Sequence, residues 1–196
     1  MLSGGLYCSA ENKTVPHPAA QFSLSNLDGK KVSLEGFKGH WIVLEWFNTD
    51  CMYVQEYYGK GRMQKWQGDY TAKGVVWLAI CSSAQGQPGQ HADAELRKSL
   101  LEFKMKVTDY LCDENGEVAR LYGVKSTPTV VVISPQLEIV YFGAIESTAS
   151  IEEEDIKKAD NYLLQTLDAA LAGKGVSYKK TRTYGCSIKF KDATRR

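Results

Sequence analysis

Two nearly continuous apolar runs, residues 41–47 and 75–81, flank a stretch with helical spacing, residues 53–70, that Gly59 and Gly61 interrupt. Apolar runs of this length are typical of strands buried on both faces. Two such strands joined by a helix are expected to lie parallel in one sheet, because the crossover returns the chain in the same direction. A parallel α/β core is therefore the first constraint on the fold.

The flanking sequence adds elements around this unit. Residues 22–34 alternate apolar and polar side chains around Asp28-Gly29, which predicts a β-hairpin. The further predicted elements are a helix over 93–104, a strand over 108–112, a helix over 117–124, an antiparallel hairpin of 129–134 and 138–142, and one last helix over 153–172 that stops at Gly173. Residues 1–20 are predicted to be an extended lead-in, 21–172 the folded domain, and 173–196 a polar, basic tail that carries Cys186.

Composition limits the classes of partner. The 196 residues with 43% hydrophobic side chains fit one domain with some excess. Twenty-four basic against 23 acidic residues leave a net charge of +1, which gives no electrostatic footprint for nucleic acid or a membrane surface. The sequence has neither an apolar run of about 18 residues nor a signal-peptide pattern at its start. We expect a soluble cytoplasmic chain or, alternatively, an exported chain whose signal has been removed.

Cys51 lies directly after the first apolar run and directly before the helical stretch, so its thiol is expected at a helix N-terminus. Backbone N–H groups and the positive end of the helix dipole favour thiolate over thiol at that place. A free cysteine without such a context is more often a small buried apolar residue. Position therefore makes Cys51 the candidate nucleophile.

The other cysteines show no metal-site or disulfide-framework spacing, and the three histidines lie far from them in sequence, so we predict no metal and no cofactor. Cys81 and Cys112 end strands expected to run parallel to the first, which would bring both to the sheet edge where α/β sites collect. Cys81 is the better placed for a redox role, and ordinary strand-end packing is the alternative for both. Cys8 is expected to be a bystander, and Cys186 is predicted as the distant partner of Cys51.

Thr127-Pro128, at the entrance to the strand over 129–134, resembles the cis-proline loop of the thioredoxin fold. In that loop the residues before the proline face the redox cysteine, although a proline is also a plain way to begin a strand. With Cys51 and the order of elements, the loop makes residues 21–172 resemble the thioredoxin superfamily. The resemblance implies an α/β, thioredoxin-like fold with a central mixed sheet flanked by helices, an N-terminal β-hairpin, a C-terminal tail, and a cis Thr127–Pro128 bond.

The segment FSLSNLDGKKVSLEGFKGHWIVLEWF resembles the redoxin and alkyl hydroperoxide reductase (AhpC/TSA, thiol-specific antioxidant) branch. Closer still is a peroxiredoxin-like group with a DCxxV motif, here DCMYV at 50–54, and a YGCSVKY-like tail, here YGCSIKF at 184–190. Val54 replaces the second cysteine of CxxC, so no disulfide can form within the helix. The PxxxTxxC motif of peroxiredoxins is not reproduced around Thr49.

This resemblance implies a thiol-disulfide oxidoreductase or peroxiredoxin-like antioxidant protein. Cys51 would attack a disulfide of a protein partner, or a peroxide, and Cys186 or an external thiol reductant would resolve the product. A binding module of the same fold, whose groove beside Pro128 holds an extended peptide without turnover, is the alternative. A copper chaperone would need CxxxC and a nearby histidine, which the sequence lacks.

Glu45 stands in the middle of the first apolar run, where an unpaired charge would be costly. Thioredoxins carry a buried acid beneath their cysteines as a proton acceptor, and Glu45 precedes Cys51 by six residues. The alternative is that Glu45 reaches an exposed rim or pairs with a basic residue such as Lys30. The sequence leaves both readings open.

Overall fold

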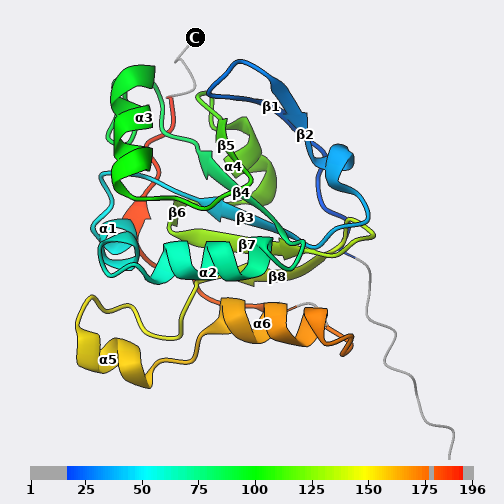
Figure 1. The fold of residues 1–196 in the computed structure, drawn as a ribbon. Coiled ribbons are helices and arrows are strands. Elements are labelled where there is room, and N and C mark those ends of the chain that lie inside the picture. Colours follow the sequence, from blue (N-terminus) through cyan, green and yellow to red (C-terminus); the bar gives the residue numbers. More distant parts are fainter. Residues whose placement is uncertain (1–16, 177–178, 192–196) are drawn as a thin grey trace, which may run out of the picture.

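An eight-stranded mixed sheet runs through the computed structural model, which describes residues 17–176 and 179–191 (Figure 1). Cys8 and most of the predicted lead-in lie outside the described residues. The strands of the large sheet, in spatial order, are β2 (Lys31–Ser33), β1 (Ser23–Asn26), β5 (Asp109–Cys112), β4 (Val76–Cys81), β3 (Ile42–Trp46), β7 (Thr129–Ile133), β8 (Ile139–Gly143) and β9 (Lys179–Lys180). Two more strands, β6 (Ser126–Thr127) and β10 (Cys186–Ser187), form a small second sheet.

The predicted parallel core is confirmed. β3 pairs parallel with β4, and β4 pairs parallel with β5, while β7 joins the other side of β3 in the antiparallel direction. Every residue of β3 and β4 is buried, as their continuous apolar sequences indicate. The hairpins β1–β2 and β7–β8 are antiparallel, also as predicted.

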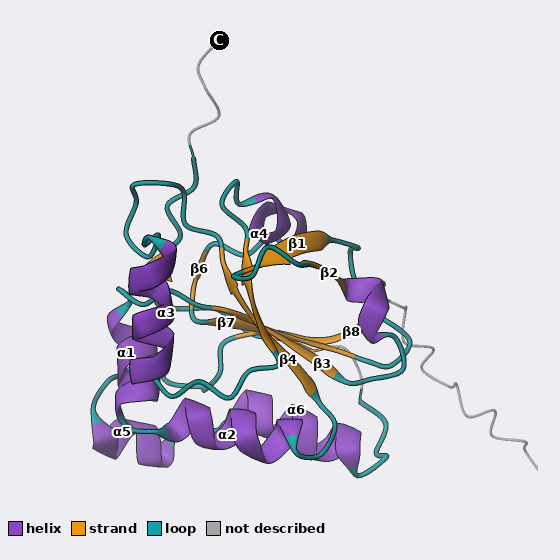
Figure 2. Ribbon diagram, turned by 45° about the horizontal axis from the view of Figure 1, so that its top comes forward, coloured by secondary structure: helices purple, strands orange, loops and turns teal. Residues whose placement is uncertain are grey.

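Helices cover both faces of the sheet, and Figure 2 shows α4 on the opposite side from α2 and α6. The helices are α1 (Met52–Gly59), α2 (Arg62–Thr71), α3 (Asp93–Glu102), α4 (Glu117–Tyr122), α5 (Glu153–Lys158) and α6 (Tyr162–Leu171), with a 3₁₀ turn at Leu34–Phe37. Alternation along β3 builds the two cores: Val43 and Phe47 pack with α1, α2 and α6, whereas Leu44 and Trp46 pack with α4 and the first hairpin. None of the helices in the described ranges is long and apolar enough to cross a bilayer.

The prediction of one last helix over residues 153–172 is wrong, because the chain breaks there into α5 and α6. Ala159 has an extended backbone, and the Asn161 side chain caps α6 by accepting a hydrogen bond from the Leu164 amide at 2.8 Å. Helix α5 buries none of its residues, so Ile156 does not continue the apolar stripe of α6. The predicted stop at Gly173 is confirmed, with a left-handed φ of 66°.

The C-terminal tail adds to the sheets and is not a merely polar extension. β9 pairs parallel with β8, and Thr181 then fixes the chain: its amide donates to Phe142 O at 3.0 Å and its hydroxyl accepts from the Ala144 amide at 3.1 Å. Beyond it, β10 pairs antiparallel with β6, and Ile188 is buried. The tail thus adds an edge strand to the large sheet and forms the small second sheet with β6.

Candidate active site

Cys51 is the N-cap residue of α1, so its predicted place at a helix N-terminus is confirmed. Its backbone is extended, with φ −84° and ψ 119°, and its carbonyl oxygen accepts the first helical hydrogen bond, from the Gln55 amide at 2.9 Å. The thiol is fully buried and donates to the Thr127 carbonyl oxygen at 3.1 Å. The helix start and the β6 loop therefore meet at this sulfur.

The Thr127–Pro128 peptide bond is cis, as predicted from the resemblance. Thr127 is buried, and its hydroxyl has no hydrogen-bond partner within the described part of the chain. The neighbouring Thr129 differs, since its hydroxyl donates to Ser126 O at 2.7 Å. Of Thr127, only the backbone serves the site in this conformation.

Cys186 lies beside Cys51 while both are free thiols. Its strand β10 makes Cys186 the register partner of Thr127. Burial raises the pKa of Cys186, and the hydrogen bond and charge of the adjoining Cys51 thiol raise it further, against hydrogen bonds from the backbone of Met52 and Tyr53. The docking of the tail on β6 brings the two thiols together while both are reduced.

A cluster of polar and aromatic side chains that the sequence analysis did not single out holds the tail beside Cys51. The Tyr184 ring packs on Tyr53 with centroids 5.6 Å apart, and its hydroxyl hydrogen-bonds with that of Tyr57 at 3.1 Å. Tyr57 donates to buried Glu146 at 3.0 Å, and Arg62 donates to the same carboxylate at 3.1 Å. Only the tyrosine of the YGCSIKF motif could have indicated this cluster; Glu146 and Arg62 carry no sequence signal.

Glu45 is fully buried, so the exposed-rim alternative and the pairing with Lys30 are wrong. Its carboxylate accepts three hydrogen bonds from neutral donors: Trp77 Nε1 at 2.7 Å, the Tyr58 hydroxyl at 2.9 Å and Gln67 Nε2 at 3.1 Å. Burial raises the pKa of Glu45, and the three donors offset this in part. Because Tyr58 belongs to α1, the Glu45 carboxylate helps to fix the position of the helix whose N-cap residue is Cys51.

Cys81 and Cys112 lie opposite each other as free thiols at the ends of β4 and β5. They are register partners, and the Cys81 thiol donates to Gly89 O at 3.3 Å. Burial raises the pKa of Cys81, and burial together with the Cys81 charge raises the pKa of Cys112 to about 11. Both are therefore held as thiols at neutral pH, which suits packing better than nucleophilic attack.

Asp50, which precedes Cys51, connects the loop before α1 to the loop after β4. Its carboxylate accepts from the Gly89 amide at 2.7 Å and hydrogen-bonds with His91 Nε2 at 3.0 Å. Its amide donates to the Asn48 side chain at 2.7 Å. These contacts fix the turn that presents Cys51 to α1.

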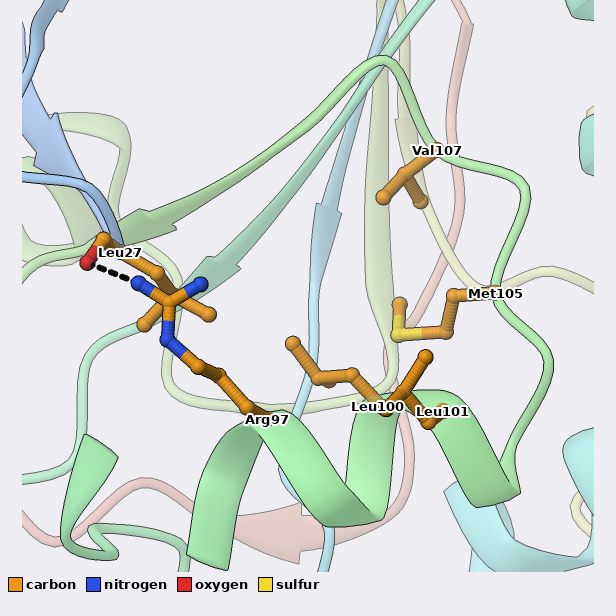
Figure 3. Close-up of a pocket in the computed structure, with 6 residues that line it drawn as sticks. All are labelled: Leu27, Arg97, Leu100, Leu101, Met105 and Val107. Carbon is orange, nitrogen blue, oxygen red and sulfur yellow. Dashed lines mark hydrogen bonds between the residues drawn. The ribbon is translucent and has the colours of Figure 1, made fainter. Parts of the chain in front are cut away.

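Two other features of the surface carry no chemistry for this site. No group of three or more metal-ligating side chains is found in the described ranges. An apolar hollow of about 340 Å³ lies between the β1–β2 turn and α3, and Figure 3 shows Arg97 reaching across it to the Leu27 carbonyl oxygen. Its lining is Leu27, Arg97, Leu100, Leu101, Met105 and Val107, so it contains no cysteine.

Comparison with known proteins gives relatives for both the sequence and the fold. The AhpC/TSA family model matches residues 15–142. The thiol-disulfide oxidoreductase ResA of Bacillus thuringiensis is 26% identical over 161 residues, which cover 79% of this chain and 83% of that protein. An uncharacterized conserved protein from Geobacillus kaustophilus has a similar structure, with TM-score 0.75 and 28% identity over 93% of this chain and 96% of its own.

A further similar structure is a putative thiol:disulfide interchange protein DsbE from Chlorobium tepidum. Its TM-score is 0.60 at 23% identity, and the match covers 80% of this chain and 96% of that one. At this identity the likeness concerns the fold. The predicted thioredoxin-like architecture, with its mixed central sheet flanked by helices, is confirmed.

Proposed function

The chain belongs to the AhpC/TSA family and is a thiol-dependent oxidoreductase, and from this premise we propose that Cys51 is its redox nucleophile and Cys186 its resolving cysteine. The observation that carries the proposal is the docking of β10 on β6, which sets the Cys186 thiol against the Cys51 thiol. Val54 occupies the position where a CxxC motif would supply a local partner. The tail therefore supplies the second thiol that α1 lacks.

The proposed reaction reduces a disulfide R–S–S–R′ of a protein partner. The Cys51 thiolate attacks the sulfur attached to R, so that the mixed disulfide Cys51–S–S–R forms while the S–S bond of the substrate breaks and the released R′S⁻ takes up a proton. Cys186 then attacks the Cys51 sulfur, forming the Cys51–Cys186 disulfide and releasing RSH. Two electrons pass from the dithiol to the substrate, and an external thiol reductant returns them by the same exchange.

A peroxide is the second candidate oxidant, since the family includes thiol-specific antioxidant proteins by its name. In that reaction Cys51 would become a sulfenic acid with release of water, and Cys186 would condense with it, releasing a second water. The missing PxxxTxxC motif ranks this reaction behind disulfide exchange. A peptide-binding module without turnover is the alternative, and it would leave Cys51 and Cys186 as free thiols in the experiment below.

Glu45 has two roles in this proposal, as a brace for α1 and as a proton acceptor. Its carboxylate is buried under α1 and bound to Tyr58, a residue of the helix that begins after Cys51. A carboxyl group with a raised pKa can exchange a proton at a pH closer to neutrality than an exposed one. The acid would thus accept the proton that Cys51 loses and hold α1 in register while it does so.

The deciding experiment is non-reducing peptide mapping after one equivalent of hydrogen peroxide, with the wild-type chain and the variants C51S, C186S and C112S. We expect a Cys51–Cys186 disulfide in the wild type and in C112S, the control that removes another half-buried thiol. C186S should instead accumulate sulfenic acid on Cys51. A Cys51–Cys81 link, or sulfinic acid on Cys51 with Cys186 free, would overturn the assignment.

The working compartment decides which reductant the site meets. That the protein works in the cytoplasm stays a prediction, and export with removal of a signal peptide is the alternative. Rapid acid quenching of cells stops thiol exchange, and alkylation of the denatured protein at neutral pH followed by peptide mapping then measures the redox state of Cys51 and Cys186 in the cell. A reduced pair is expected in the cytoplasm, where thiols are kept reduced, and an oxidised pair in an exported protein that awaits a reductant.

A further inference from the structure

Residues 184–190 of the chain lie along β6 as a bound extended peptide would. In Figure 1 the red strand near the C-terminus lies beside β6. Cys186 pairs with Thr127 and Ser187 with Ser126 in the antiparallel direction. The contact continues beyond the two strands, since the Ile188 amide donates to Lys125 O at 2.9 Å and Lys189 O accepts from the Ala84 amide at 2.9 Å. Strand addition of this kind gives affinity through the backbone, and pockets for side chains give specificity.

The side chains of this segment fill three separate places. Tyr184 packs on Tyr53. Ile188 is 7% exposed and belongs to the core on the α4 face. Phe190 lies under the Arg120 guanidinium, 4.5 Å from its ring centroid. The rest of the fold therefore binds three side chains of this segment in order along the chain, an aromatic, an aliphatic and a second aromatic one.

Gly185 places the strictest requirement on the sequence of a segment that docks on β6. It has a left-handed φ of 119°, and a Cβ atom there would lie 2.0 Å from the Thr127 carbonyl oxygen, closer than any side chain can come. The same oxygen accepts the hydrogen bond of Cys51. A segment can bring its cysteine to Cys51 on this path only when glycine directly precedes that cysteine.

The docked segment lies against Cys51, which has no exposed surface. A substrate disulfide cannot reach the buried sulfur while residues 184–190 occupy β6. Substrate and tail must therefore use the same edge in turn.

We propose that the edge of β6 on which β10 docks is a binding site for an extended peptide in which glycine directly precedes cysteine, and that residues 184–190 are its resident intramolecular ligand, which an external partner displaces. This inference rests on the proposed function for the meaning of Cys51, and it names the class of protein segment that the site accepts. The tail acts as a competitor before substrate binding and as the source of the resolving thiol afterwards.

The test compares the full-length variants G185A and G175A under reducing conditions. G185A puts a Cβ against Thr127 O, whereas a Cβ at Gly175 meets nothing within 4 Å, which makes G175A the matched control. The probe is a fluorescent synthetic peptide of residues 182–191 with Ser in place of Cys186, and a second peptide carries Ala in place of Gly185 as well. Fluorescence anisotropy measures their binding, and the rate of iodoacetamide labelling at Cys51 measures access.

In G185A we expect Cys51 labelling to rise by about tenfold or more, equivalent to about 1.4 kcal/mol of lost docking. The glycine peptide should bind G185A at least about tenfold more tightly than it binds the wild type or G175A, and it should slow the labelling again. The alanine peptide should do neither. Equal labelling of G185A and G175A, or equal binding of the two peptides, would refute the proposal.

Two measurements keep the test decisive. If G185A fails to fold by circular dichroism, Y184A replaces it, because that change removes the contacts with Tyr53 and Tyr57 at one end of the segment and leaves Ile188 in place. Anisotropy reports peptide binding without any reaction of Cys51. The binding site can therefore fail while the Cys51–Cys186 disulfide forms, or succeed while it does not, and the two proposals are judged separately.

Discussion

Thr127 contacts both cysteines of the site: it is the register partner of Cys186 across β10 and β6, and its carbonyl oxygen accepts the hydrogen bond of the Cys51 thiol. One backbone position thereby fixes both sulfurs. The hydroxyl of Thr127 contributes nothing to this arrangement, whereas the peptide backbone contributes all of it. The two parts of the residue can therefore be separated by substitution.

Thr127→Val should leave the protein as stable as the wild type or stabilise it by up to about 1 kcal/mol, because an unpaired buried hydroxyl is costly. Thr129→Val is the matched control and should cost about 1 kcal/mol, since it breaks the 2.7 Å hydrogen bond with Ser126 O. Urea unfolding measures both free energies. A T127V variant as destabilised as T129V would mean that the Thr127 hydroxyl has a partner in solution.

Glu45→Gln should flatten the dependence of stability on pH. Burial raises the pKa of Glu45 above its ordinary value of 4.5, so the native state binds a proton more tightly than the unfolded chain. Its favourable contribution is complete below that unfolded value and is lost as pH rises through the folded value. Wild-type stability should therefore fall across this range relative to E45Q, measured by urea unfolding, and the exposed E35Q control should follow the wild type. Parallel curves for E45Q and the wild type would contradict the raised pKa.

Arg62→Ala should destabilise the protein by about 2–4 kcal/mol, because it leaves the buried Glu146 carboxylate without its cation. The same change should loosen the tail, since Glu146 also binds Tyr57, the partner of Tyr184. Lys65→Ala on the same helix removes only an exposed pair with Asp69 and should cost less than about 0.5 kcal/mol. Thermal unfolding compares the two; similar losses would show that Glu146 finds another partner.

The C81A/C112A double variant should keep the Cys51–Cys186 disulfide in peroxide mapping. Because the pKa of Cys112 lies at about 11, its iodoacetamide labelling in the wild type should rise steeply only as pH approaches that value. Labelling is followed by peptide mass spectrometry from pH 6 to 10. Loss of the disulfide in the double variant, or Cys112 labelling that is already complete at pH 7, would return these cysteines to the candidate site.

Local pattern was enough to predict the sheet core and the place of Cys51. The apolar runs of β3 and β4 and the two glycines between the bodies of α1 and α2 are local features of the sequence. The spacing of residues within a short window is therefore enough to predict them. The break before Asn161 escaped prediction because the apolar spacing of Ile156 continues across it, and a single capping side chain decides the matter.

Contacts between distant segments could not be predicted in the same way. Glu146 is defined by Tyr57 and Arg62, which lie far from it in sequence, and no motif marks the three together. Strand order alone led to the expectation that Cys81 lies near Cys51, whereas the register of β4 with β5 places Cys81 opposite Cys112. Side-chain register, which sequence pattern leaves open, made the difference.

The anchor at Thr181 limits how far the released tail can travel. Its bonds to Phe142 and Ala144 hold the chain just ahead of residues 182–186, so Cys186 stays within about 17 Å of a fixed point even when β10 leaves β6. A thiol on so short a tether has an effective concentration of the order of millimolar or more at its target. Resolution of the mixed disulfide should then proceed at a rate independent of protein concentration, and free thiols at micromolar levels should not intercept it.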